Sequence, residues 1–454
     1  MKNSTKDMTV GSPLKLIIGF AVPMLLGILF QQFYNMVDAM VIGKWIGTEA
    51  LAGVGSTSSI NFMIVGFCTG LGTGFAIPVA QSFGAKDYSA LRRFIANTVW
   101  VSIVLVSVLT VIVSIFCRDI LVLMLTPKDV FEYAYDYIFI IFVGLPVLYA
   151  YNLLAAIIRA LGDSKSPVFF LIISAGLNII LDIISVGVLD MGVRGPALAT
   201  VISQSVSVIL CFVYMRKKFD VLNFQKGEWR PDVKKMFTSL SMGVPMGLQY
   251  SITAIGSVIF QRSVNELGTV YVAALAAAQK VGSLATCPYE ALGGTMATYA
   301  GQNTGVGNTK RIHKGVLCAV VIGAIYWILA FIVLFFFGDK ISLLYLDAKE
   351  IEIIKNAHLY LIVHSASYIL LNLVNNLRFS IQGMGYSMFA ILAGVLEMIA
   401  RGFLGIVLIP AFGYTAACFS GTIAWLLADM FLVPAYFLCV RALQKRYAKA
   451  QLTS

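Results

Sequence analysis

The five residues Phe20-Ala21-Val22-Pro23-Met24 have a counterpart 222 residues further along the chain, in Met242-Gly243-Val244-Pro245-Met246. Two more pairs of short segments match at an offset of 221 residues, namely 80–84 with 301–305 and 162–166 with 383–387. Three matches at nearly one offset indicate that the chain contains two copies of one unit, so the fold of the first half predicts the fold of the second.

Long apolar runs fill both copies. The chain has 454 residues, of which 59% are hydrophobic and 12% are charged, a composition unlike that of soluble domains. A helix needs about 20 mostly apolar residues to cross the hydrocarbon core of a bilayer. Twelve runs of this kind predict twelve membrane-spanning helices, near 14–42, 52–80, 94–117, 134–158, 167–188, 195–215, 236–261, 271–299, 315–337, 357–377, 387–409 and 414–440.

Six spans in each copy set the arrangement of the two halves. Because six is even, both copies enter the membrane from the same side, which makes a parallel repeat with its pseudo-axis along the membrane normal. The sequence thus predicts an all-α polytopic membrane protein with two six-helix lobes and a cleft between them. We expect an N-lobe at 1–215, a cytoplasmic linker at 216–234, a C-lobe at 235–440 and a cytoplasmic tail at 441–454.

The net charge of +11 reflects orientation in the membrane and predicts no nucleic-acid partner. Most Lys and Arg residues, including Arg92 and Arg378, fall at span ends or loops on the side of the N-terminus, and cytoplasmic loops carry such an excess. We therefore expect a multi-pass protein of the plasma or inner membrane with both termini in the cytoplasm. The first apolar run, which starts at Leu14, is too long for a signal-peptide core and is expected to remain as the first span.

Several function classes are disfavoured by missing motifs. The sequence contains no G-x-x-x-x-G-K-[ST] motif, so we expect neither ATPase activity nor an ATPase partner, and an ion gradient is the natural energy source. The seven Cys residues form no C-x-x-C pair and the three His residues have no zinc-ligand spacing. A membrane enzyme is therefore not expected, and no cofactor is expected besides a coupling ion.

The informative residues are acids inside the predicted spans, because an acid at the centre of a membrane helix costs about 2.5–3.5 kcal/mol and marks a functional site by default. They are Asp38, Asp182, Glu290, Glu397 and Asp429. Asp38 and Asp182 have no acidic counterpart in the second copy, so the shared fold does not require them.

Asn178 and Asp182 are four residues apart and share one helix face. Together with Asp38 they offer two carboxylates and an amide oxygen, which suit either a small cation or a proton. Two structural alternatives remain at this point. In the first, Asp38 lies at the membrane interface or pairs with Lys44. In the second, Asn178 and Asp182 form a polar contact between helices.

The C-lobe acids are open to more than one interpretation. Glu290 follows Pro288 in the eighth span, so it either faces the cleft and attracts cations or pairs with Lys280. Glu397 and Arg401 are four residues apart and are expected to form an ion pair, with a gating or substrate role as the alternative.

Three further residues are weaker candidates. Asp429, near Trp425, is either a polar contact within the C-lobe or a cleft residue. His358 and His364 lie near the tenth span, where a proton-relay role is the less favoured reading.

The combination and order of several short motifs are more specific than any one of them. They are Val37-Asp38 with Ala50-Leu51-Ala52, Gly162-Asp163-Ser164-Lys165, Asn178 to Asp182, Gly195-Pro196-Ala197-Leu198-Ala199-Thr200, Tyr299-Ala300-Gly301-Gln302-Asn303 and Glu397 to Arg401. In this combination the chain resembles the multidrug and toxic compound extrusion (MATE) family, from about Leu14 to Tyr436.

The resemblance implies a secondary active antiporter that exports organic cations and amphipathic drugs by alternating access, driven by inward Na⁺ or H⁺. It implies a cation-coupling site at Asp38, Asn178, Asp182 and Thr200, which would be the metal site if the ion is Na⁺. Candidate substrate contacts are Gln32, Tyr34, Asn35, Glu290 and Arg401.

One departure from the family pattern concerns the second lobe. The seventh span has no acid before Glu266 and the tenth has none after Glu352, which argues against an ion site there. The alternatives are a flippase for lipid-linked oligosaccharides, which would need several cationic residues in its cleft, and another solute exporter of the same fold.

Overall fold

The computed structural model describes residues 7–124 and 126–453, and every regular element in this part of the chain is helical. The first half contains α1 (Pro13–Val41), η1 (Ile42–Ile46), α2 (Thr48–Ser56), α3 (Ser58–Gly84), α4 (Tyr88–Ile115), α5 (Cys117–Leu123), α6 (Phe131–Val143), α7 (Leu145–Ala160), α8 (Lys165–Gly187), α9 (Arg194–Lys218) and η2 (Asp220–Leu222). The second half contains α10 (Val233–Asn265), α11 (Thr269–Gly305), α12 (Thr309–Ser342), α13 (Ile351–Ala366), α14 (Tyr368–Gly383), α15 (Ser387–Phe403), η3 (Leu404–Leu408), α16 (Ile409–Phe412), α17 (Tyr414–Cys418) and α18 (Ser420–Thr453).

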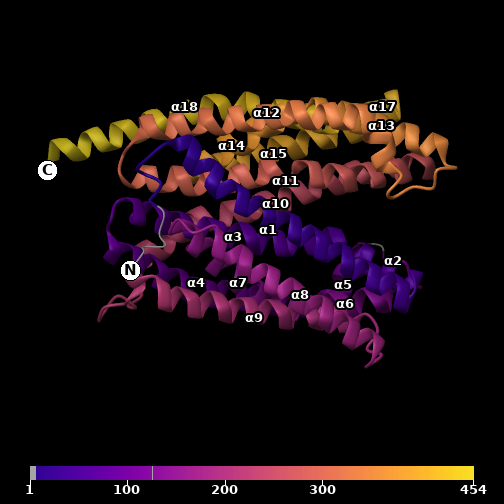
Figure 1. Ribbon diagram of the computed structural model, residues 1–454, viewed down its shortest axis with the longest axis horizontal. Helices are drawn as coiled ribbons and strands as arrows, with labels where there is room; N and C mark the ends of the chain where they lie inside the picture. The colour runs from indigo at the N-terminus through magenta and orange to yellow at the C-terminus, as the bar shows by residue number, and fades with distance from the viewer. Residues whose placement is uncertain (1–6, 125, 454) are drawn as a thin grey trace. The chain divides into compact units, whose positions relative to one another are not determined.

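Long helices dominate both halves (Figure 1), and most of them are apolar. Within the described residues, ten helices are long and apolar enough to cross a membrane, and the number rises to 12 if each of two bent pairs is one span. The bent pairs are α6 with α7, at 51°, and α13 with α14, at 48°. The predicted fold class, a polytopic all-α membrane protein with about twelve spans, is confirmed.

The duplication is visible in the turns between helices. Asp87 and Asn308 lie 221 residues apart, and each caps a helix by accepting a hydrogen bond from the backbone N–H three residues later, at 2.9 and 3.0 Å. The residue before each cap, Lys86 or Gly307, has a positive φ of 57° or 70°. Lys86 holds a conformation that glycine adopts more readily, so the turn geometry of the second copy is kept in the first despite its side chain.

The helix packing repeats in the same way. In the first copy α3 packs against α7 and α8 packs against α9, while in the second copy α11 packs against α14 and α15 against α18. Each pair joins helices at corresponding positions of the two copies. The apolar cores follow this arrangement, with one large cluster of buried side chains in each half.

Packing divides the chain differently from the repeat. One compact unit contains Leu26–Ser251, whereas the other contains Met8–Leu25 and the residues from Ile252 onward. The division crosses α1 and α10, so the start of α1 belongs to the second unit. There Met8 donates its backbone N–H to Gln302 Oε1 (2.8 Å) and accepts a hydrogen bond from Asn303 Nδ2 (3.2 Å).

Candidate functional site

Two acids far apart in the sequence meet inside the first unit. Asp38 lies on α1 and Asp182 on α8, and their exposed fractions are 8% and 0%. Their carboxyl groups are near enough to interact directly. Within the described residues Asp38 forms no ion pair with Lys44, so the alternative of a surface pair does not hold.

Small residues let the two helices approach at both ends. A Cβ atom added to Gly27 of α1 would lie 2.9 Å from Val168 Cγ2 near the start of α8. A Cβ atom added to Gly187, at the end of α8, would lie 2.6 Å from the Trp45 ring of η1. Larger residues at either position would push the helices apart, and the two acids lie between these contacts.

Asn178 and Thr200 complete the predicted constellation. Asn178 lies one turn before Asp182 and is 1% exposed, and Thr200 lies on α9, which packs against α8. The side-chain atoms buried without a well-aligned hydrogen bond are Asp38 Oδ1, Asp182 Oδ1 and Oδ2, Asn178 Oδ1 and Nδ2, and Thr200 Oγ1. Each such atom costs about 1–3 kcal/mol unless something binds it.

The donor set fits a small hard ion. Carboxylate, amide and hydroxyl oxygens are the ligands that hard cations prefer, and two adjacent buried carboxylates also accept a proton readily. In the described part of the chain no group of three or more His, Cys, Asp or Glu side chains has an arrangement suited to a metal ion. The oxygen donors of this site suit Na⁺ or H⁺ better than a transition metal, which favours His and Cys ligands.

Further polar residues surround the two acids. Tyr34 is buried near Asp38, and its hydroxyl interacts with the side chains of Gln31 and Gln204. Tyr137 of α6 lies within electrostatic range of both carboxyl groups. Tyr137 and Gln204 were missed from the sequence, although Gln204 follows Thr200 by four residues and therefore shares its helix face.

The ion pair expected between Glu397 and Arg401 is present, but a second arginine lies closer to Glu397. Arg401 Nη2 lies 3.9 Å from Glu397 Oε2, as the spacing predicts, but the closer partner of Glu397 is Arg378 of α14, whose Nη2 contacts Oε1. Arg378 is buried, with an exposed fraction of 5%. Arg401 also donates to Ser257 Oγ at 3.1 Å, so this guanidinium is already engaged by protein groups.

Comparison with known proteins agrees with the duplicated fold. The sequence model of the MatE family matches residues 23–184 and again residues 245–428, once in each copy. The chain belongs to the MatE family. The resemblance inferred from the motifs is therefore confirmed.

Two curated relatives and one solved structure are similar to this MatE chain. The probable multidrug resistance protein YoeA of Bacillus subtilis (strain 168) is 31% identical over 77% of each chain. An FAD transporter of Shewanella oneidensis is 22% identical over 78% of each chain. The crystal structure of MATE in complex with MaL6 superimposes with a TM-score of 0.90 at 21% identity, covering 97% of this chain and 100% of that one.

The other substrate candidates in this MatE protein differ in their exposure. Gln32 is half-buried, and Asn35 and Glu290 are exposed. Glu290 forms no ion pair with Lys280 in the described structure, so that alternative for Glu290 does not hold.

The linker of this MatE protein is tied to α4 by a buried ion pair. Arg92 donates to both carboxylate oxygens of Glu228, from Nε at 2.6 Å and from Nη2 at 2.8 Å. Ser89 Oγ and the backbone N–H of Gln225 donate to the same carboxylate. These hydrogen bonds, those from Arg92 above all, lower the pKa of Glu228 to about 2.

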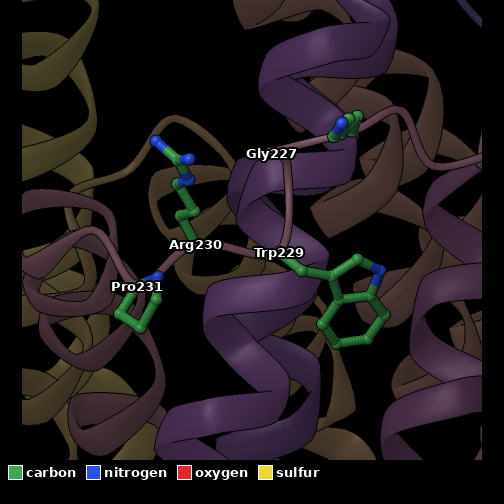
Figure 2. A pocket seen from close by; sticks show the side chains of 5 residues that line it. Gly227, Trp229, Arg230 and Pro231 are labelled. Atoms are coloured by element: carbon green, nitrogen blue, oxygen red, sulfur yellow. The ribbon is translucent and has the colours of Figure 1, made fainter.

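A shallow pocket of about 650 Å³ lies on the same linker. Figure 2 shows Trp229, Arg230 and Pro231 on the loop that forms it. Lys226 and Gly227 complete the lining. Its two cationic side chains do not suit an organic cation, so we do not assign the substrate site to this pocket.

Proposed function

We propose that this MatE protein is a secondary active antiporter that exports organic cations and amphipathic drugs in exchange for inward Na⁺ or H⁺. The observation that supports the proposal is the buried, closely spaced pair Asp38 and Asp182, which has no cationic side chain of its own among the described ion pairs. The similarity to the probable multidrug resistance protein YoeA supports it.

The paired carboxylates are proposed to couple ion and drug movement. Two anionic groups at this spacing repel each other, so the site favours uptake of one positive charge, either Na⁺ or a proton. Asn178 and Thr200 would supply neutral oxygens to Na⁺ when it is bound. Occupancy changes the charge on the α1–α8 contact, and a conformational change follows only if the ion binds one state more tightly than the other.

Orientation and partners complete the proposal. We propose that this multi-pass protein lies in the plasma or inner membrane with both termini cytoplasmic, because Lys and Arg are in excess on that side. Alternating access would expose the cargo site to the two sides in turn. No nucleic acid, ATPase partner, enzymatic activity or cofactor beyond the coupling ion is proposed.

A second candidate is an exporter of another solute with the same fold. The relative named as an FAD transporter, which is 22% identical over 78% of each chain, favours it. The cargo would then be an anionic nucleotide in place of an organic cation, while the paired acids would keep their coupling role.

The deciding experiment measures efflux from vesicles that contain the purified protein. A fluorescent organic cation is loaded, and a Na⁺ gradient or a pH gradient is imposed separately. We expect one of the two gradients to accelerate efflux, and we expect no acceleration when neither gradient is imposed. The variant Asp129→Asn, which changes an exposed loop acid, serves as the matched control for variants of the paired acids Asp38 and Asp182. Unchanged efflux of a broad panel of cations under both gradients would refute cation export, and gradient-driven FAD efflux would support the second candidate.

A further inference from the structure

Asp429 of α18 is a buried acid without hydrogen bonds in the second unit. Its exposed fraction is 6%, and neither Oδ1 nor Oδ2 has a hydrogen-bond partner. An ionised carboxylate in this position would carry a full charge with no donor to either oxygen. Such a group is expected to take up a proton, because the neutral form is far less costly to bury.

The neighbouring charges are distributed unevenly. Arg378 lies within electrostatic range of Asp429, yet its Nη2 contacts Glu397 Oε1. Arg401 directs a second guanidinium toward the same Glu397, with Nη2 3.9 Å from Oε2. Glu397 therefore has two cations, and neither oxygen of Asp429 accepts a hydrogen bond from one. This distribution is the one expected when Asp429 is neutral.

We propose that Asp429 is a proton-binding site of the second unit and that Arg378 changes its carboxylate partner when the proton leaves. On release, the Asp429 O–H bond breaks, the electron pair stays on the carboxylate and the proton passes to water. Two guanidinium groups then face two carboxylates. Arg378 turns to Asp429, and Glu397 keeps Arg401. The site takes a proton rather than Na⁺, because a nearby guanidinium repels a metal cation.

Arg378 is the charged side chain that acts on Asp429, and the other titratable groups near α18 have other contacts. Helix α18 packs against α12, α13, α14, α15 and α17. The charged or titratable groups from these helices near α18 include Arg378 and Tyr368 (α14), Glu397 and Arg401 (α15), Tyr360 and His364 (α13), His313 (α12) and Tyr414 (α17). His364 stacks on Trp425 at 4.8 Å between ring centroids, and His313 contacts Tyr436, further along α18.

Infrared spectroscopy of the purified protein in detergent tests the proton directly. A protonated carboxyl group absorbs at a higher C=O frequency than a carboxylate. At neutral pH we expect part of this band to disappear in Asp429→Asn and to remain in the double variant Asp38→Asn/Asp182→Asn. The control Asp129→Asn should leave the band unchanged. An undiminished band in folded Asp429→Asn would overturn the proposal.

Isotope labelling keeps the test valid if the Asn variant does not fold. With ¹³C-carboxyl aspartate, part of the high-frequency band of the wild-type protein should shift. In Asp429→Glu that part should be unlabelled and should not shift. A labelled band of wild-type intensity in Asp429→Glu would contradict the assignment.

A double-mutant cycle tests the change of partner. Thermal unfolding is measured for Asp429→Asn, Arg378→Gln and their combination, at neutral and at alkaline pH. We expect additive effects at neutral pH and a clear coupling at alkaline pH, where Asp429 is ionised and binds Arg378. Equal coupling at both pH values would overturn the switch. The infrared and the thermal unfolding measurements use no transported substrate, so they are independent of the proposed export function.

Discussion

Helices α8 and α15 occupy corresponding places in the two copies, and each carries a buried acid. The surroundings of the two acids differ in charge. On α8, Asp182 lies against Asp38 with no basic side chain among its interactions in the described structure. On α15, Glu397 lies between the guanidinium groups of Arg378 and Arg401. A buried charge must be paired or neutralised. In the first copy we propose that an incoming ion does this, whereas in the second copy Arg378 and Arg401 supply the counter-charges of Glu397.

We propose that the difference assigns separate tasks to the α8 acids and to Glu397 of α15. An acid whose counter-charge is mobile responds to ion concentration, as a coupling site must. An acid held by two arginines on neighbouring helices stabilises the packing of α14 and α15 instead. The comparison can be broken by showing that the α8 acids are structural, or that the α15 acid titrates with the coupling ion.

The largest effect is expected at the α1–α8 acids. Asp38→Asn should abolish gradient-driven export and leave folding nearly unchanged, because the amide keeps the shape of the side chain and removes its charge. Asp182→Asn should do the same. The double variant should be no worse than either single variant, because residues that act as one unit are not additive. The measurement is the transport rate in vesicles at matched protein content.

The control for this prediction is Asp129→Asn, which removes an acid of the same type from an exposed loop. It should transport at the wild-type rate. Fully coupled transport by Asp38→Asn would show that α8 does not carry the coupling site, and the contrast with α15 would then fail.

The next effect is a loss of stability at α15. Arg378→Ala should lower the free energy of unfolding by about 3 kcal/mol, because it leaves a buried carboxylate without its closer partner. Arg401→Ala should cost less, about 1 kcal/mol, since its nitrogen is 3.9 Å from Glu397. The unfolding transition of purified protein in detergent gives both values. Equal losses would mean that the i, i+4 pair matters as much as the contact between helices.

The ion pair between Arg92 of α4 and Glu228, which lies between η2 and α10, provides a conventional reference. Glu228→Gln should cost about 2 kcal/mol, because it weakens the charged hydrogen bonds from Arg92. The pKa of Glu228 is lowered from 4.5 to about 2, so its contribution is complete above pH 4.5 and is lost as the pH falls toward 2. The stability difference between wild type and variant should therefore shrink over this pH range. A constant difference down to pH 2 would argue against the ion pair.

The sequence predicted the helices better than their ends or breaks. Apolar length alone indicates a span, but a polar cap extends the helix beyond it, as at Asp87, where α4 starts at Tyr88 and not near 94. The bend before Leu145 had a signal in Gly144 and Pro146, whereas the equivalent bend at Ser367 has no glycine or proline. Hydropathy is insensitive to both bends, because the chain stays apolar through them.

The candidate site was predictable where a single residue was costly by itself. Asp38 and Asp182 stood out as acids inside apolar runs, and the structure brings them together. Arg378 did not stand out, since it directly follows the predicted span 357–377. In the structure α14 continues to Gly383 and buries it. Contacts between helices that are distant in sequence, such as Arg378 with Glu397, depend on packing that no local pattern reveals.

The smallest expected effect distinguishes the two possible coupling ions. Thr200 Oγ1 is buried without a hydrogen bond beside α8, so it is positioned to serve as a neutral ligand for Na⁺ but would add little to a proton held by the carboxylates. If Na⁺ is the ion, Thr200→Val should weaken its apparent affinity on the order of tenfold, equivalent to about 1.4 kcal/mol, while Thr200→Ser should retain it. If H⁺ is the ion, neither variant should shift the pH dependence of export. Measuring the transport rate against Na⁺ concentration and against pH for both variants separates these outcomes, and identical weakening by valine and serine would exclude the hydroxyl as a ligand.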